Sequence, residues 1–159
     1  MIEMKKLDGS SPARLRSQRE RVSATRREMA KLCQAGEFVA LESQDDERGF
    51  AFWLALVKGP AFRHTGRQEI KDGVQLKCNG WYVTVTMFDR FPESSSKTFQ
   101  SCQYQWTVDA EALVGRNVVV KEIGSRHRTR SASEAPAVSV RMSEEEVKRI
   151  ETLCAVRLN

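Results

Sequence analysis

The side chains most able to do chemistry are few and widely spaced in this chain of 159 residues. Its two histidines, His64 and His127, lie in polar segments far from any cysteine, and the four cysteines form no CxxC pair that would begin a zinc site. Asp45 and Asp46 fall in a charged run that is typical of a turn. The motifs GxGxxG, HExxH and GxSxG are all missing from the sequence. The sequence therefore predicts a protein that is not an enzyme and that uses no metal and no cofactor.

Clustered positive charge is the second chemical feature of the sequence. The net charge is +5 and the pI is near 9.2. One cluster runs from Arg14 to Lys31, and a second begins at Lys121. Such clusters indicate a polyanionic partner such as nucleic acid, or acidic protein tails, although a solvated helix face explains a charge run about as often. The candidate nucleic-acid-binding residues are Arg14, Arg16, Arg19, Arg21, Arg26, Arg27, Arg126, Arg128 and Arg130.

The first arginine cluster falls on a predicted helix. Ser11 is a suitable N-cap, Pro12 suits the first helical position, and Gly36 supplies a stop. We therefore predict a basic helix over residues 11–35, preceded by a flexible N-terminus at residues 1–10. Because the arginines spread around this helix, we expect them to contact phosphates without reading bases.

A second helix is predicted near the C-terminal end. Ser143 and Glu146 have the spacing of a capping box, and Met142 and Val147 stand at the two positions of a hydrophobic staple. The prediction is a short helix over residues 143–157, which docks through one apolar stripe.

Between the helices, residues 36–123 read as short strands. The runs GEFVALES, FAFWLALVK, WYVTVTMF, TFQSCQYQWTV and NVVVKEI have strand composition, and FAFWLALVK is apolar enough for burial on both faces. Asn79-Gly80 separates VQLKC from WYVTVTMF, which predicts a hairpin. Residues 59–73 read as a loop, DAEALVG as a single helical turn, and residues 124–142 as a linker. The predicted fold is mainly β, a small antiparallel barrel of five or six strands with flanking helices, because closure removes exposed edges.

Residues 36–92 resemble the Tudor-type, Src-homology-3-like small barrels of chromatin proteins. The order GEFVALES, charged turn, FWLALV and VTVTMFDRF is similar to the first core strands of that family. Trp53, Ala55 and Val57 repeat its alternating pattern, and Phe88 and Phe91 stand where it has two aromatic residues. In members that read methylated lysine or arginine, such rings hold the cation against their faces. The resemblance thus makes Trp53, Phe88 and Phe91 candidate cage residues, with core packing as the alternative for Trp53 and Phe88.

These observations lead to three hypotheses about function. The first is a chromatin-associated reader or scaffold subunit that recognises a protein tail, with or without methylated lysine or arginine. The second is an RNA- or DNA-binding accessory protein that acts through the basic helix, and the third is a purely structural subunit of a larger complex. No apolar run approaches the roughly 20 residues of a membrane span, and the N-terminus has no secretory signal. We expect an intracellular, nuclear protein with no membrane partner.

Overall fold

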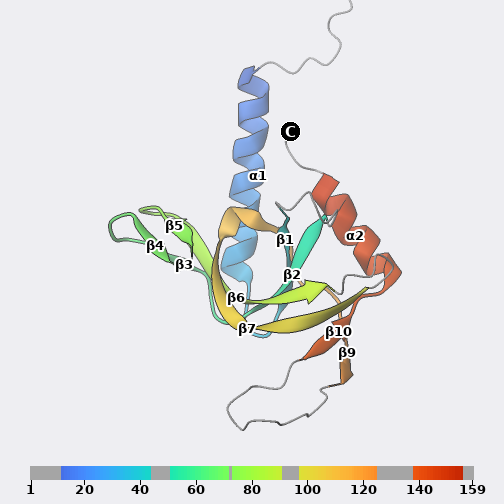
Figure 1. Ribbon diagram of the computed structural model, residues 1–159. Helices are drawn as coiled ribbons and strands as arrows, with labels where there is room; N and C mark the ends of the chain where they lie inside the picture. The colour runs from blue at the N-terminus through green and yellow to red at the C-terminus, as the bar shows by residue number, and fades with distance from the viewer. Residues whose placement is uncertain (1–11, 44–50, 72, 91–96, 125–137, 156–159) are drawn as a thin grey trace, which may run out of the picture.

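The computed structural model describes residues 12–43, 51–71, 73–90, 97–124 and 138–155. Within these ranges two helices and ten strands follow one another (Figure 1), and a short 3-10 turn, which we call η2, comes after β7. The elements are α1 (Pro12–Leu32), β1 (Phe38–Glu42), β2 (Phe52–Val57), β3 (Phe62–Arg63), β4 (Glu69–Lys71), β5 (Val74–Leu76), β6 (Trp81–Arg90), β7 (Thr98–Asp109), η2 (Ala110–Ala112), β8 (Leu113–Gly115), β9 (Lys121–Gly124), β10 (Ser139–Arg141) and α2 (Glu144–Ala155).

The strands form one large antiparallel sheet and one small hairpin. The order in the large sheet is β8-β1-β2-β6-β7-β10-β9, with β3 paired to β6, while β4 and β5 pair only with each other. The predicted mainly β fold with flanking helices is therefore confirmed. The predicted closure is not seen, because within the described residues no pairing joins β8 to β9. One open edge is protected in another way: β8 has only three residues and contacts both helices.

Each helix covers one face of the sheet, and the alternation of strand residues explains why both faces are apolar. Val39, Ala55 and Val85 point to the face where α1 lies, and they form the α1-side core with Ala30 of α1 and with Cys33, which directly follows α1. The opposite face carries the α2-side core, which contains Ala40, Leu54, Phe88, Phe99, Val147, Ile150 and Cys154. The predicted double burial of β2 is thus confirmed, since Leu54 and Ala55 are both fully buried.

The C-terminal helix begins where its capping residues predict. The Ser143 Oγ accepts a hydrogen bond from the Glu146 N–H at 3.1 Å, and Met142 and Val147 are both buried in the α2-side core. The carboxylate of Glu146 points away from the cap and accepts hydrogen bonds from the Val119 N–H and from Arg149. Glu146 thereby ties α2 to the segment before β9. Neither helix in the described ranges is long and apolar enough to cross a membrane.

The hairpin predicted around Asn79-Gly80 is wrong in its pairing. The turn exists, with Asn79 at φ 69° and the Gly80 N–H donating to the Lys77 carbonyl at 3.0 Å. However, β5 pairs with β4 and β6 pairs with β3. The reason is Tyr82, whose hydroxyl accepts from the Lys77 N–H and donates to the Gln75 carbonyl, so that its side chain takes the place of a strand partner. A Cβ on Gly80 would stand 2.8 Å from the Tyr82 oxygen.

Two segments without predicted strands contain short ones. Residues 59–73, expected to be a loop, contain β3 and β4, and the expected linker at 124–142 contains β10. β10 pairs with both β7 and β9, which extends the large sheet beyond the predicted end of the barrel. Three residues are too short a run to show an alternating pattern, so the strand signal is weak here.

Candidate functional site

A groove lined by aromatic side chains lies across β2, β6 and β7, and we call it the aromatic groove. It encloses about 600 Å³, and the tip of the β4–β5 hairpin contributes Gly73 and Val74 to its wall. Three of its lining rings are exposed: Trp53 by 38%, Trp106 by 42% and Tyr104 by 70%. Large exposed rings around one hollow are uncommon on a surface without a partner, so this groove is the first place to look for a ligand.

The strand register brings the two indoles onto the same face of the sheet. Met87 on β6 pairs with Ala55 on β2, and Trp106 on β7 pairs with Val85 on β6, so these four residues share a face. Trp53 lies two residues before Ala55 and therefore points the same way. Met87 thus stands on the strand between the two indole-bearing strands. Its thioether contributes a polarisable surface to a site built mainly of rings.

The three predicted cage residues have different outcomes. Trp53 is exposed in the aromatic groove. Phe88 borders the same hollow but is only 4% exposed, and its ring lies edge-on to Phe38 in the α2-side core, with centroids 5.2 Å apart. It faces the opposite side of the sheet from Trp53, because it pairs with Leu54. Phe91 lies outside the described residues.

Charge in the aromatic groove is provided by Asp89 and Arg90. The Asp89 carboxylate is exposed and accepts a hydrogen bond from the Cys102 thiol at 3.0 Å. Burial, reinforced by this carboxylate, raises the pKa of Cys102 to about 11, so the thiol stays protonated at neutral pH. The Arg90 guanidinium lies over the Phe99 ring, 5.8 Å from its centroid, and interacts with Glu151 on α2. The negative charge of Asp89 is therefore the one presented beside the exposed rings.

Among the six predicted arginines on α1, Arg26 and Arg27 contact residues far along the chain. Arg26 donates to the Glu42 carboxylate and to the Glu111 carbonyl, both at 2.8 Å, and its side chain is 13% exposed. Arg27 donates to the Glu111 carboxylate at 2.7 Å and remains partly exposed. These contacts hold α1 against β1 and η2, so Arg26 is engaged in docking the helix.

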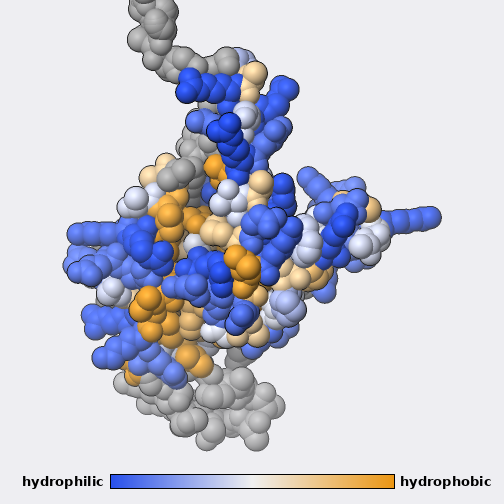
Figure 2. Space-filling view, turned by 180° about the vertical axis from the view of Figure 1, so that it is seen from behind, coloured by the Kyte–Doolittle hydropathy of each residue, from blue (hydrophilic) through white to orange (hydrophobic). Residues whose placement is uncertain are grey.

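The remaining predicted arginines on α1 lie beyond the point where the helix meets the sheet. Arg14, Arg16, Arg19 and Arg21 are exposed. Figure 1 shows this half of α1 standing away from the sheet, and hydrophilic side chains cover much of it in Figure 2. The candidates Arg126, Arg128 and Arg130 lie outside the described residues.

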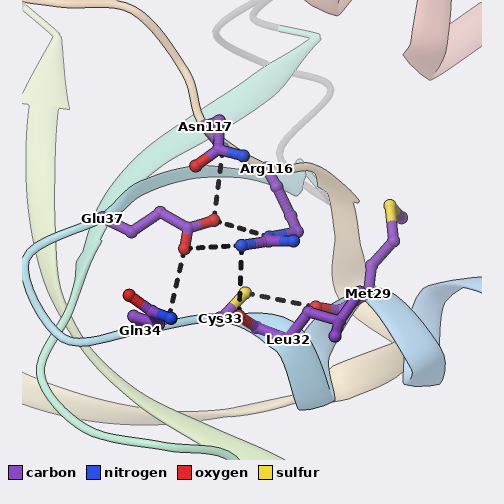
Figure 3. A network of polar contacts seen from close by, with 7 residues as sticks. All are labelled: Met29, Leu32, Cys33, Gln34, Glu37, Arg116 and Asn117. Carbon is purple, nitrogen blue, oxygen red and sulfur yellow. Dashed lines mark hydrogen bonds and ion pairs between the residues drawn. The ribbon is translucent and has the colours of Figure 1, made fainter.

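A polar network fixes the C-terminal end of α1, and we call it the α1 clamp (Figure 3). The Glu37 carboxylate accepts two hydrogen bonds from the Arg116 guanidinium, at 2.7 and 3.0 Å, and others from the Gln34 and Asn117 N–H groups. Arg116 also donates to the Leu32 carbonyl at 3.1 Å. Burial alone would raise the pKa of Glu37, but the hydrogen bonds, above all those from Arg116, outweigh it and hold the pKa below its ordinary value. The clamp joins α1, β1 and the β8–β9 connection.

Sequence reasoning missed two of the three exposed rings. Tyr104 and Trp106 occur in QYQWTV, where aromatic residues alternate with glutamines. In a strand, alternation of this kind places the rings on one face and the amides on the other. That pattern was a usable signal for an aromatic surface, although only the register of β7 shows that Trp106 lies on the same face as Trp53.

The described residues include no cluster of three or more His, Cys, Asp or Glu side chains that could hold a metal ion. The four cysteines, all within the described residues, form no disulfide, and Cys33 and Cys154 are buried. Comparison with known proteins gave no match to a family model, to a curated protein or to a solved structure. The function must therefore be argued from the geometry of the chain itself.

Proposed function

We propose that the protein is a non-enzymatic binding module, of the Src-homology-3-like Tudor type, that holds a cationic lysine or arginine side chain of a protein tail in the aromatic groove. The proposal includes a nuclear, chromatin-associated setting, as expected from the resemblance of residues 36–92. The ring set differs from the one predicted from sequence: Trp53 is kept, and Trp106 and Tyr104 take the places given to Phe88 and Phe91.

The observation that carries this proposal is the combination of exposed rings with a carboxylate in one hollow. Trp53 and Trp106 share a face of the sheet, Tyr104 is the most exposed of the lining rings, and Asp89 lies on the strand between the two indoles. Indole faces attract cations more strongly than phenyl faces, and a nearby carboxylate adds Coulombic attraction. The groove is therefore complementary to a positively charged, partly apolar side chain.

The expected strength of the interaction follows from these contacts. A cation–π contact contributes about 0.5–2 kcal/mol, and desolvation in a groove moves the value toward the upper end. Contacts with one to three of the rings would then supply about 0.5–6 kcal/mol before the cost of association is subtracted, so we expect weak binding, with a dissociation constant in the millimolar range.

Fluorescence anisotropy with labelled peptides tests the proposal. The probes are Gly/Ser-flanked peptides with one central residue: lysine, trimethyllysine, asymmetric dimethylarginine or norleucine, which has the apolar stem of lysine without the charge. We expect at least one cationic peptide to bind at least about tenfold more tightly than the norleucine peptide. Trp53→Ala and Trp106→Ala should each weaken that binding by about 2- to 30-fold, the equivalent of 0.5–2 kcal/mol.

Ile70→Ala is the matched control, because Ile70 is an exposed large side chain on β4 that does not line the groove. It should bind the peptides as the wild type does. Equal affinity for the norleucine and cationic peptides, or wild-type binding by both tryptophan variants, would refute the proposal. A structural subunit whose helices dock on a larger partner would then become the better reading of the fold.

A further inference from the structure

A second hollow, distinct from the aromatic groove, lies where α1 meets the segment that contains β3, β4 and β5. It encloses about 320 Å³. Three cationic side chains converge on it from three separate parts of the chain: Arg27 from α1, Arg63 from β3 and Lys77 from the turn before β6. The remaining lining residues are Asn79, Gly80, Trp81, Tyr82, Asp109 and Glu111. We call this hollow, together with α1 on one side and residues 58–77 on the other, the basic cleft.

One wall of the basic cleft is a face of α1. Arg27 lines the hollow, and the Lys31 ammonium lies 4.8 Å from the centroid of the Trp81 ring, which also lines it. Arg16 precedes Arg27 by eleven residues, so the two side chains lie within about 20° of each other around the helix axis. The face that turns toward the hollow therefore carries Arg27 at its partly buried end and Arg16 at its exposed end, with the acidic Glu20 between them.

The other wall is provided by Arg63 and Lys77, which belong to the segment from Lys58 to Lys77. We therefore consider the charge of this segment as a whole. It contains five Lys or Arg residues and two acidic residues, a net charge of +3 over twenty positions. The five basic side chains, Lys58, Arg63, Arg67, Lys71 and Lys77, are all exposed. Figure 1 shows the β4–β5 hairpin extending away from the sheet on one side while α1 rises from it in another direction, and Figure 2 shows mainly hydrophilic side chains on both projections.

The acidic groups in the cleft are engaged with neighbouring parts of the protein. Glu111 pairs with Arg27 at 2.7 Å, and the Asp109 carboxylate caps η2 by accepting from the Glu111 N–H at 2.9 Å. The charge of Asp109 also interacts with Lys77 and Arg27, so the hollow keeps a net charge of +1 from its three cationic and two acidic lining residues. Arg63 donates to the neutral Asn79 side chain at 2.8 Å and forms no ion pair with any residue that the structure describes, so its charge and further N–H groups can meet a ligand. Arg63 and Lys77 are therefore the groups best placed to meet an anion entering from solvent.

We propose that the basic cleft binds the phosphodiester backbone of a nucleic acid, with Arg63 and Lys77 on its phosphates and α1 along its side. The two positively charged elements, α1 and residues 58–77, extend away from the hollow in different directions. Together they match a long polyanion better than a small anion, because phosphates recur along a strand at the spacing of neighbouring surface charges. No specific base contact is included, so the interaction reads charge and shape rather than sequence. This site is separate from the aromatic groove, and either proposal can fail without the other.

Fluorescence anisotropy with labelled oligonucleotides of about 20 nucleotides tests this inference. The probes are single-stranded oligothymidylate, oligouridylate and a DNA duplex, each titrated at several NaCl concentrations between 50 and 200 mM. We expect micromolar to sub-millimolar dissociation constants and a steep dependence on salt, as for other sequence-independent binders. The comparison among probes identifies which form of nucleic acid the cleft prefers.

The double variant Arg63→Ala/Lys77→Ala should weaken binding by about tenfold or more. It should also reduce the slope of log K against log salt by about 1.4 for single strands, which corresponds to two lost phosphate contacts. Both residues are exposed, and the thermal midpoint should confirm that the variant stays folded.

The matched control is Arg141→Ala/Lys148→Ala, which removes the same charge from exposed positions on β10 and α2. It should retain most of the affinity. If none of the three probes binds at 50 mM NaCl, or if the control loses as much affinity as the cleft variant, the inference is overturned.

Discussion

The α1 clamp offers a quantitative test of how the N-terminal helix is held on the sheet. The perturbation is Arg116→Ala, which removes both hydrogen bonds to Glu37 and the one to the Leu32 carbonyl. The Glu37 carboxylate, whose side chain is 9% exposed, would keep only the backbone N–H groups of Gln34 and Asn117. The variant therefore leaves a nearly buried negative charge without its cationic partner.

The magnitude follows from the burial of the two partners. Breaking a fully buried ion pair by removing one side chain costs about 3–5 kcal/mol, whereas an exposed pair contributes about 0–1 kcal/mol. Arg116 is 23% exposed and Glu37 less so, which places the clamp nearer the buried limit. We expect a loss of about 2–4 kcal/mol in the free energy of unfolding. For a chain of this length, a loss of about 3 kcal/mol lowers the melting temperature by about 6–12 °C.

Thermal and urea unfolding at pH 7, followed by circular dichroism, measure this loss. The control is Lys97→Ala, which breaks an ion pair whose carboxylate, on Glu144, is 67% exposed. Solvent screens that pair, so the control should lose at most about 1 kcal/mol. If Arg116→Ala is no less stable than Lys97→Ala, the clamp does not hold α1, and the reasoning from burial is wrong.

Three further predictions concern stability and reactivity. Gly80→Ala should destabilise the protein by about 1–3 kcal/mol in urea unfolding, because the added methyl group overlaps a buried phenol. The folded-state pKa values of Glu37 and Glu146 are lowered from 4.5, so the stability that these carboxylates contribute is complete above pH 4.5 and is lost as the pH falls below it. Unfolding curves from pH 6 to pH 3 should show this loss of stability, and Glu37→Gln should make it smaller. At pH 8, iodoacetamide should alkylate exposed Cys78 well before Cys33, whose pKa burial raises to about 11, as mass spectrometry of timed samples would show.

The elements that the sequence predicts well are those whose signals are local. The start of α2 depends on Ser143 and Glu146, which are three residues apart, and both the cap and the helix are as expected. The same holds for the double burial of β2, which follows from its composition. The Asn79-Gly80 turn is also local and is present, but the strands that it was expected to pair find other partners. Strand pairing depends on where the Tyr82 side chain packs, and the residues of the turn do not predict that contact.

The candidate site shows the same division between local and distant information. Alternation along β6 indicates that Phe88 and Met87 face opposite sides, but only packing decides that Phe88 belongs to the interior. Arg26 resembles its neighbours on α1 in every local respect. Its role in docking is set by Glu42 and Glu111, which lie 16 and 85 residues further along the chain. Because these partners are so far along the chain, the sequence alone could not show which arginines of α1 are exposed and which are engaged in docking the helix.

The placement of one helix on each face of the sheet has a consequence for biosynthesis. Chains emerge from the ribosome with the N-terminal part first, so α1 is made before β6, η2 and β8, on which it packs, and α2 is made after every described strand. Until then Leu54, Phe88 and Phe99 have no cover from Val147 and Ile150. A nascent chain that has been synthesised as far as β10 but not α2 therefore exposes a broad hydrophobic surface. During this stage of synthesis, binding by a chaperone would protect the chain from aggregation.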